Sequence, residues 1–280
     1  MPELPEVECL TRAVRKVAKG GRLVLADFLR KDLRDPIPIK EFKRLMEGAV
    51  VEDVLRRSKY LLMKTPKAYG VFHLGMTGNM LWLKSRTPEI PHTHAVFTIE
   101  DKHGKPGYLH FIDARRFGRI DVVHCSDADT LAAHPHFADL GPEPLTHKDL
   151  GKYLFERSRK KKQPIKSFLM DARVVVGVGN IYASEALFRA GINPKRKAGT
   201  VTQERYALLG KAVVQTLNKA IDAGGTTFRD FKNSDGNPGY FKIQLAVYDR
   251  KGEPCEKCGT LIKDLRQSGR STFFCPLCQL

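Results

Sequence analysis

Hydrophobic residues follow two different periods in the first 135 positions of the chain. After Pro5, the apolar residues Val7, Leu10, Val14 and Val17 recur at steps of three and four until Gly20, which predicts one helix. A shorter helical pattern runs over 39–46. The rest of this half favours short strands, and several short strands in one region are typical of a β-sandwich or barrel. The predicted strands are RLVLADF, AVVEDVLRR, YLLMKT, YGVFHLGM, HAVFTIED, GYLHFID and GRIDVVH.

The second half changes to helical spacing after a turn-rich stretch in which Pro135, Pro142 and Pro144 interrupt regular structure. Helices are predicted over 150–157, 165–172, 180–190 and 203–222. We therefore expect an α+β multidomain chain whose N-terminal β-sandwich with flanking helices is followed by a helical domain. The expected limits are 1–135 for the sandwich, 136–147 for a linker, 148–241 for the helical domain and 242–280 for a terminal ribbon.

Four of the six cysteines form two Cys-x2-Cys pairs separated by 16 residues. This spacing is typical of a four-thiolate zinc site, whereas a redox site would need one pair alone. We predict one structural Zn2+, with the intervening residues as a hairpin too small to fold without metal. The predicted ligands are Cys255, Cys258, Cys275 and Cys278.

The balance of charge points to a polyanionic partner. The chain has 48 Lys+Arg against 31 Asp+Glu, a formal charge of +17 and a pI near 9.7, which favours nucleic acid over a small acidic substrate. A merely basic surface is the alternative. The run RSRKKK at 157–162 fits a phosphate-contacting segment and a solvated loop equally well. Without a long apolar run or an export signal, the expected location is the cytoplasm, with no membrane association.

Seven features in one order, from end to end of the chain, resemble the bacterial formamidopyrimidine-DNA glycosylase family. They are MPELPEVE, RRSKYLL, HLGMTG, DARRFG, GVGNIYASEALF, SDGNPGYF and the four-cysteine ribbon. The resemblance implies a helix-two-turn-helix arrangement for the helical domain. It also implies a bifunctional DNA glycosylase and abasic-site lyase that excises oxidised purines from duplex DNA.

The same resemblance assigns the catalytic residues. If Met1 is removed, Pro2 is the nucleophile, whose secondary amine forms a Schiff base with the sugar C1′. Glu3 exchanges protons, Lys59 assists base removal and strand scission, and Arg270 assists the final elimination. By themselves, Pro2 and Glu3 also read as an ordinary helix entry, and Glu6 reads equally well as a helix-start residue or as support for the site. Lys59 follows Arg56 and Arg57 where charged and apolar residues alternate, so by itself it reads as an exposed strand lysine.

Excision requires the nucleotide to leave the helix, and the resemblance implies that Met76, Arg115 and Phe117 fill the gap. From residue types alone, Met76 and Phe117 would be core residues and Arg115 a solvated one. Ala114 departs from the proline usual in DARRFG, which leaves the rigidity of that loop open. The other DNA contacts that we expect are His73, His92, Lys161 and Asn180, the last at a helix start that suits a phosphate or a plain cap.

A Gly-rich stretch, 224–241, matches the lesion-recognition loop of the oxidised-purine branch, with Thr226, Phe228, Arg229, Asp230 and Phe231 as the expected reading residues. A structural linker is the alternative. The expected partner is double-stranded DNA carrying 8-oxoguanine, formamidopyrimidines or abasic sites, bound by a monomer. Two rival functions stay open: an endonuclease VIII-like glycosylase for oxidised pyrimidines and a lesion-binding protein without turnover.

Overall fold

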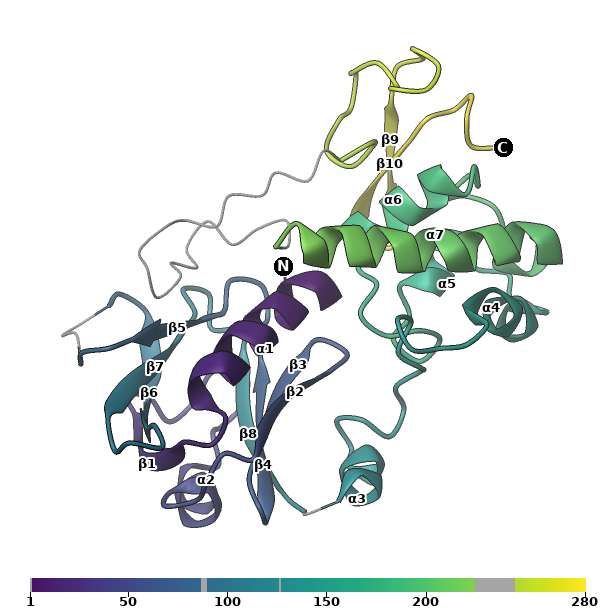
Figure 1. Cartoon of the computed structure of the whole chain (residues 1–280). Coiled ribbons are helices and arrows are strands. Elements are labelled where there is room, and N and C mark those ends of the chain that lie inside the picture. The colour runs from purple at the N-terminus through teal and green to yellow at the C-terminus, as the bar shows by residue number, and fades with distance from the viewer. Residues whose placement is uncertain (1, 87–89, 126, 225–244) are drawn as a thin grey trace. The chain divides into compact units, whose positions relative to one another are not determined.

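The fold was analysed in a computed structural model that describes residues 2–86, 90–125, 127–224 and 245–280. Residues 2–138 belong to one compact unit, and residues 139–223 with 245–280 belong to a second (Figure 1). The junction between the units falls inside the stretch 136–147, for which the sequence predicts a linker.

Two antiparallel four-stranded sheets form the N-terminal unit. Strand order is β1-β6-β7-β5 in one sheet and β2-β3-β4-β8 in the other. Phe72 from the second sheet and Phe97 from the first meet with ring centroids 5.3 Å apart, so the sheets pack face to face over a shared core. The predicted β-sandwich is confirmed. The strands are β1 Arg22–Phe28, β2 Asp53–Arg57, β3 Tyr60–Lys64, β4 Ala68–His73, β5 Asn79–Leu83, β6 Thr93–Glu100, β7 Pro106–Ile112 and β8 Arg119–His124.

In the described part of this unit, three helices accompany the sandwich: α1 Leu4–Ala18, α2 Ile39–Met46 and α3 Ala128–Ala133. The first buries Leu4, Val7, Leu10 and Val14 against the sheets, as its apolar spacing requires. The sequence prediction missed β5 and α3. Strand β5 is five residues long and α3 is six, and elements of that size carry too few periods to stand out.

Helices dominate the C-terminal unit, as predicted. They are α4 Leu150–Ser158, α5 Ile165–Leu169, α6 Asn180–Arg189, the 3-10 helix η1 Ala198–Thr200 and α7 Gln203–Asp222. Helices α4 and α7 cross at Gly151 and Gly210, where a Cβ on Gly210 would lie 2.5 Å from the Gly151 nitrogen. Glycine is therefore required at this crossing.

A small hairpin completes the C-terminal unit. Strands β9 Lys263–Gln267 and β10 Arg270–Phe274 pair antiparallel between the two cysteine pairs, which confirms the predicted ribbon. The buried carboxylate of Glu185 in α6 accepts backbone N–H bonds of 2.9 Å from Ala246, Val247 and Tyr248. These bonds attach the chain entering the ribbon to the helical domain.

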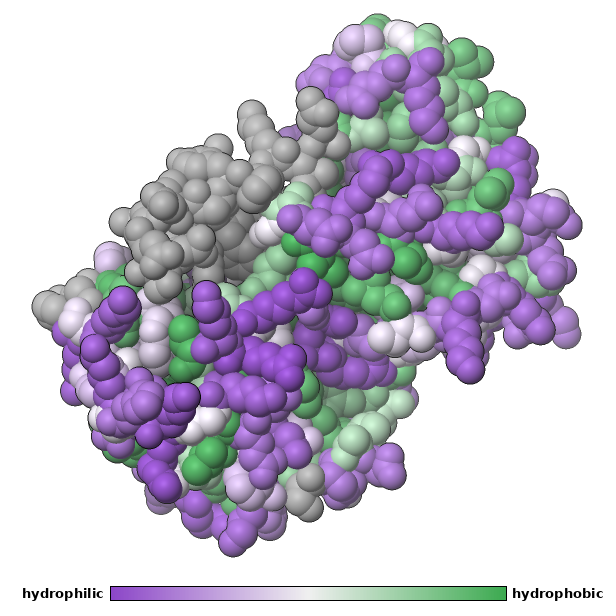
Figure 2. All heavy atoms as spheres, in the orientation of Figure 1, coloured by the Kyte–Doolittle hydropathy of each residue, from purple (hydrophilic) through white to green (hydrophobic). Residues whose placement is uncertain are grey.

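The surface of both units is largely hydrophilic on the face that Figure 2 shows. None of the helices in the described ranges combines the length and apolar composition that crossing a lipid bilayer requires.

Candidate functional site

The N-terminal residues form a tightly held helix start. Glu3 is the N-cap of α1 and is 2% exposed. The Glu6 carboxylate accepts a 2.8 Å hydrogen bond from the Glu3 N–H, while the Glu3 side chain accepts one from the Glu6 N–H, which makes a capping box. Glu6 is therefore a helix-start residue that also fixes Glu3. Pro2, half-buried, lies directly before this box.

Lys59 lies in a turn, whereas its charged and apolar neighbours predicted a strand position. Ser58 and Lys59 form the two-residue connection between β2 and β3, and Ser58 has a φ of 56°. Turns with positive φ match the twist of paired strands, so RRSKYLL folds as a tight hairpin rather than one strand. The prediction of a strand at Lys59 was therefore wrong, although its candidate role does not depend on it.

A short relay of hydrogen bonds ties this turn to α1. Arg56 donates to the Glu8 carboxylate at 2.7 Å and to the Ser58 carbonyl at 3.0 Å. The hydrogen bonds from Arg56 and Arg12 lower the pKa of Glu8 against the opposing effect of burial, so Glu8 stays ionised. Glu8 and Arg56 therefore hold the turn of Lys59 on the helix that follows Pro2 and Glu3, a role that the sequence analysis missed.

A groove of about 640 Å³ brings together four of the predicted DNA-contacting residues, His73, Met76, Arg115 and Phe117. Met76 and Phe117 are 39% and 41% exposed, so neither is a core residue. The guanidinium of Arg115 lies 4.7 Å from the centre of the Phe117 ring. Asp32, Leu33, Arg34, Gly75 and Arg116 complete the lining.

Asp113 fixes the loop that carries Arg115 and Phe117. Its buried carboxylate accepts hydrogen bonds from the Thr77 hydroxyl, from the Arg115 N–H at 3.2 Å and from the Gly118 N–H at 2.7 Å. An aspartate that accepts amides two residues on stabilises a turn by itself. Hydrogen bonds to the Asp113 side chain thus hold this loop, although the chain has Ala114 where the proline usual in DARRFG would stand.

His73 lies at the end of β4 in a cationic setting. Burial, and then the nearby charges of Lys59, Arg119 and Arg34, lower the pKa of His73 to about 4. Its Nδ1 accepts a hydrogen bond from the Gly75 N–H at 3.1 Å. At neutral pH the imidazole is therefore uncharged with its proton on Nε2, so Nε2 is its hydrogen-bond donor.

A buried lysine organises the predicted phosphate contacts of the C-terminal unit. Lys166 is 1% exposed, and its Nζ donates to Asn180 Oδ1 at 2.6 Å, to the Ser271 carbonyl at 2.9 Å and to the Thr272 hydroxyl at 2.9 Å. It connects the start of α6 with β10, next to Arg270. A cavity of about 180 Å³ is lined by Lys166 and Arg270 together. A lysine in a helical pattern gives no sequence signal for such a role.

Lys161 and His92 are two further predicted DNA contacts, and neither is among the residues that line the groove of Met76 and Phe117. Lys161 is exposed in the turn between α4 and α5, and His92 is exposed with a φ of 65° while its carbonyl accepts the Asp113 N–H at 3.0 Å. Thr226, Phe228, Arg229, Asp230 and Phe231 lie outside the described residues. Their assignment to lesion recognition stays a prediction.

The four thiolates predicted for zinc come together in the ribbon. Their Sγ atoms all lie within 4.8 Å of one another, with Cys258 and Cys275 3.5 Å apart and Cys255 and Cys278 3.9 Å apart. A tetrahedral Zn²⁺ with bonds of about 2.3 Å separates its sulfur ligands by about 3.8 Å. The cluster therefore fits one structural zinc ion, which the ribbon needs because its own core is small.

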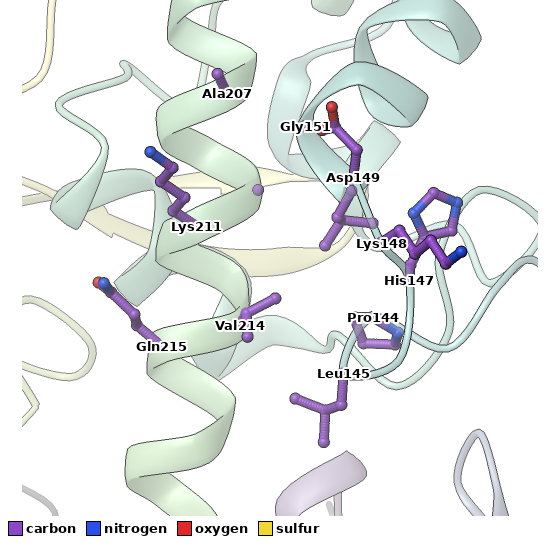
Figure 3. A pocket seen from close by; sticks show the side chains of 12 residues that line it. Pro144, Leu145, His147, Lys148, Asp149, Gly151, Ala207, Lys211, Val214 and Gln215 are labelled. Atoms are coloured by element: carbon purple, nitrogen blue, oxygen red, sulfur yellow. The ribbon is translucent and has the colours of Figure 1, made fainter.

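The C-terminal unit also carries a groove of about 580 Å³ between α7 and the chain leading into α4 (Figure 3). Lys148 and Lys211 border it, and Leu145 and Val214 contribute apolar surface. Among the residues that the structure describes, none of the predicted site residues lines this groove.

Comparisons with known proteins agree over the whole length. Residues 1–120 match the formamidopyrimidine-DNA glycosylase N-terminal domain, residues 140–232 the formamidopyrimidine-DNA glycosylase H2TH domain, and residues 252–280 the zinc finger found in FPG and IleRS. Proteins called formamidopyrimidine-DNA glycosylase from Marinobacter nauticus and Stenotrophomonas maltophilia are 43% and 45% identical, with 100% of each chain covered.

Solved structures show the same likeness. A Lactococcus lactis FPG variant in complex with a Fapy-dG containing DNA is 30% identical, with a TM-score of 0.87 and 99% of each chain covered. The Lactococcus lactis Fpg in complex with an abasic site containing DNA is 30% identical, with a TM-score of 0.86 and 99% of each chain covered.

Proposed function

This chain belongs to the formamidopyrimidine-DNA glycosylase family, and from that premise we propose that it excises oxidised purines from double-stranded DNA and then cleaves the strand. The substrates are 8-oxoguanine and formamidopyrimidines opposite an intact base, and abasic sites for the second step. The protein acts in base excision repair as a monomer, in the cytoplasm where bacterial DNA lies.

The groove that joins Met76, Arg115 and Phe117 is the observation that carries this proposal. Two exposed apolar side chains beside an arginine suit the space that an everted nucleotide leaves, since the wedges replace stacking and the guanidinium bonds the unpaired base. The uncharged His73 lines this groove, and the positive charge of Lys59 is close enough to lower the pKa of His73. Together they supply a hydrogen-bond donor and a positive charge for a DNA phosphate.

The chemistry begins at the helix start. The amine of Pro2, exposed once Met1 is removed, forms a bond to C1′ while the bond from C1′ to the base breaks, and the base leaves with a proton. Glu3, fixed by its capping box, supplies that proton exchange at the sugar or the amine. The bond from C1′ to the ring oxygen then breaks, the oxygen takes up a proton, and the opened sugar is left as an iminium on Pro2. This iminium acidifies the C2′ proton, whose removal expels the 3′ phosphate. Lys59 assists this scission, and Arg270 assists the elimination of the 5′ phosphate.

The four cysteines and the recognition loop have different tasks. Zinc bound by Cys255, Cys258, Cys275 and Cys278 would stabilise the folded ribbon. The folded ribbon in turn fixes the position of Arg270. The stretch 224–241 reads the everted purine.

Cleavage of duplexes carrying 8-oxoguanine, thymine glycol or no lesion tests the proposal. We expect strand cleavage at 8-oxoguanine and much less at thymine glycol. Preferential cleavage at thymine glycol would assign the chain to the pyrimidine branch. Binding of lesion duplexes without cleavage would assign it to the lesion-binding class.

A further inference from the structure

Three arginines line the groove that contains Met76 and Phe117. Among the described residues, Arg34, Arg115 and Arg116 have no carboxylate partner, although Arg115 contacts the Phe117 ring. Elsewhere in the unit, ion pairs neutralise Arg12, Arg15, Arg30, Arg44, Arg56, Arg86 and Arg119. Three arginines without a carboxylate partner among the described residues therefore line one groove, and Arg34 belongs to a segment to which neither the sequence nor the family resemblance gave a role.

The segment that carries Arg34 forms a second wall of the groove, beside the loop of Arg115. It is closed on itself by a 2.9 Å bond from the Ile37 N–H to the Lys31 carbonyl. It is attached to the loop of Arg115 by a bond of 3.3 Å from the Arg34 N–H to the Gly118 carbonyl. One backbone hydrogen bond at this length is a weak attachment.

Side chains supply the stronger attachment. Arg119, the first residue of β8, donates from Nε and Nη2 to Asp35 Oδ2 at 2.9 and 2.5 Å. Its Nη1 lies 3.2 Å from His136 Nδ1, and His136 Nε2 lies 2.6 Å from Asp121 Oδ2. Since arginine can only donate, His136 accepts at Nδ1 and donates from Nε2 to Asp121.

Each donor in this series of hydrogen bonds thus faces an acceptor. The two ends of the series lie on different segments of the chain. Asp121 and Arg119 share strand β8, so the series begins on a rigid element. It ends at Asp35, the residue directly after Arg34. Two N–H groups of Arg119 converge on Asp35 Oδ2, and charge-assisted hydrogen bonds of this kind are stronger than neutral ones.

We propose that Arg119, held between Asp35 and His136, is a positioning residue that fixes the second wall of the groove and places Arg34 to bind a DNA backbone phosphate. The proposal rests on the proposed function, because it requires a bound duplex. Arg119 acts through Arg34 and is itself neutralised by Asp35.

The sharpest test is Asp35→Ala, because two explanations predict opposite signs. Removal of a negative charge near the groove should tighten DNA binding if charge alone matters. If Asp35 positions Arg34, binding should instead weaken about tenfold, the lower range for a hydrogen bond to a charged group. The dependence of log K on log salt should also become shallower by about 0.9, the loss of one phosphate contact. The measurement is fluorescence anisotropy with a duplex carrying a tetrahydrofuran abasic-site analogue.

Two controls separate positioning from folding and from bulk charge. Glu41→Ala makes the same charge change on α2, outside the groove, and should not weaken binding. Arg34→Ala should weaken binding about tenfold in the wild-type background and less than about twofold in the Asp35→Ala background, because coupled residues are not additive. Thermal unfolding of Asp35→Ala should match the wild type, since an exposed ion pair contributes little to stability.

Equal or tighter binding by Asp35→Ala, or the full effect of Arg34→Ala in both backgrounds, would overturn the positioning role. Failure of the wild-type protein itself to bind the duplex would instead overturn the proposed function.

Discussion

Replacing Asp113 by asparagine should loosen the loop that carries Arg115 and Phe117, although the two side chains have nearly the same shape and volume. The wild-type carboxylate accepts from the Thr77 hydroxyl and the Arg115 N–H on one oxygen and from the Gly118 N–H, at 2.7 Å, on the other. Asparagine retains one oxygen and replaces the other by an NH2 group. The new donor then faces either Gly118 or Thr77 and cannot accept.

The free-energy cost follows from burial. With the NH2 group facing Gly118, that buried N–H has no acceptor, which costs about 2 kcal/mol. With the NH2 group facing Thr77, the bond to Gly118 is kept and the partly buried bond from the Arg115 N–H is lost instead, at a smaller cost. Asp113→Ala loses all three bonds, two of them only partly buried, and should cost about 3–4 kcal/mol. Asp101 is a matched control, because its exposed carboxylate accepts N–H bonds from His103 and Lys105 at 2.8 and 2.9 Å. Water replaces those bonds, so Asp101→Ala should cost less than about 1 kcal/mol.

Equilibrium urea unfolding gives the stabilities, and single-turnover cleavage of an 8-oxoguanine duplex gives the functional effect. Displacement of Arg115 and Phe117 should slow excision roughly 10- to 100-fold in Asp113→Asn, since misplaced groups lose effective molarity. Wild-type stability in Asp113→Asn, or an equal loss in Asp101→Ala, would refute the reasoning from buried hydrogen bonds.

Three further predictions concern other parts of the chain. Chelation of zinc, or Cys258→Ser, should unfold the ribbon and abolish DNA binding, while the circular dichroism of the sandwich stays unchanged. Unchanged DNA affinity in verified zinc-free protein would contradict this prediction. Gly75→Ala should destabilise the chain by more than about 2 kcal/mol in urea unfolding, because the residue has a φ of 59° and a Cβ would lie 2.3 Å from the Phe117 carbonyl carbon. The folded pKa of His73, about 4, lies below the unfolded value of 6.5, so its contribution to stability is complete above pH 6.5 and is lost as pH falls toward 4. Urea unfolding between pH 7 and 4 should show a slope that is smaller in His73→Gln by up to about 1.4 kcal/mol per pH unit, and equal slopes would show that His73 is not held neutral.

The fold was largely predictable because its signals are local. Alternation and helical spacing identified most strands and the long helices, and the cysteine spacing identified the ribbon. Short elements escaped because β5 and α3 complete too few periods. Lys59 was placed in a strand because charge alternation across RRSKYLL continues through the turn, and only the backbone at Ser58, with its φ of 56°, breaks the pattern.

Site residues were predictable where they belong to a sequence motif whose function the family resemblance supplies. Met76, Arg115 and Phe117 belong to such motifs, and the structure places them in one groove. The supporting residues were not predictable, since their partners are distant in sequence: Arg119 bonds Asp35 across 84 positions. Neither composition nor periodicity carries information on such pairs.

The central claim, that Pro2 is the nucleophile, is tested most directly by trapping with borohydride on an 8-oxoguanine duplex. Borohydride reduces the iminium, so protein from which Met1 has been removed should form a covalent adduct that peptide mapping assigns to Pro2. A permanent N-terminal extension should abolish the adduct because it converts the amine to an amide, whereas a C-terminal tag should leave it intact. Glu3→Gln should keep the amine but slow excision by at least about a hundredfold. Full trapping by protein that retains Met1, with the adduct mapped to an internal lysine such as Lys59, would contradict the assignment.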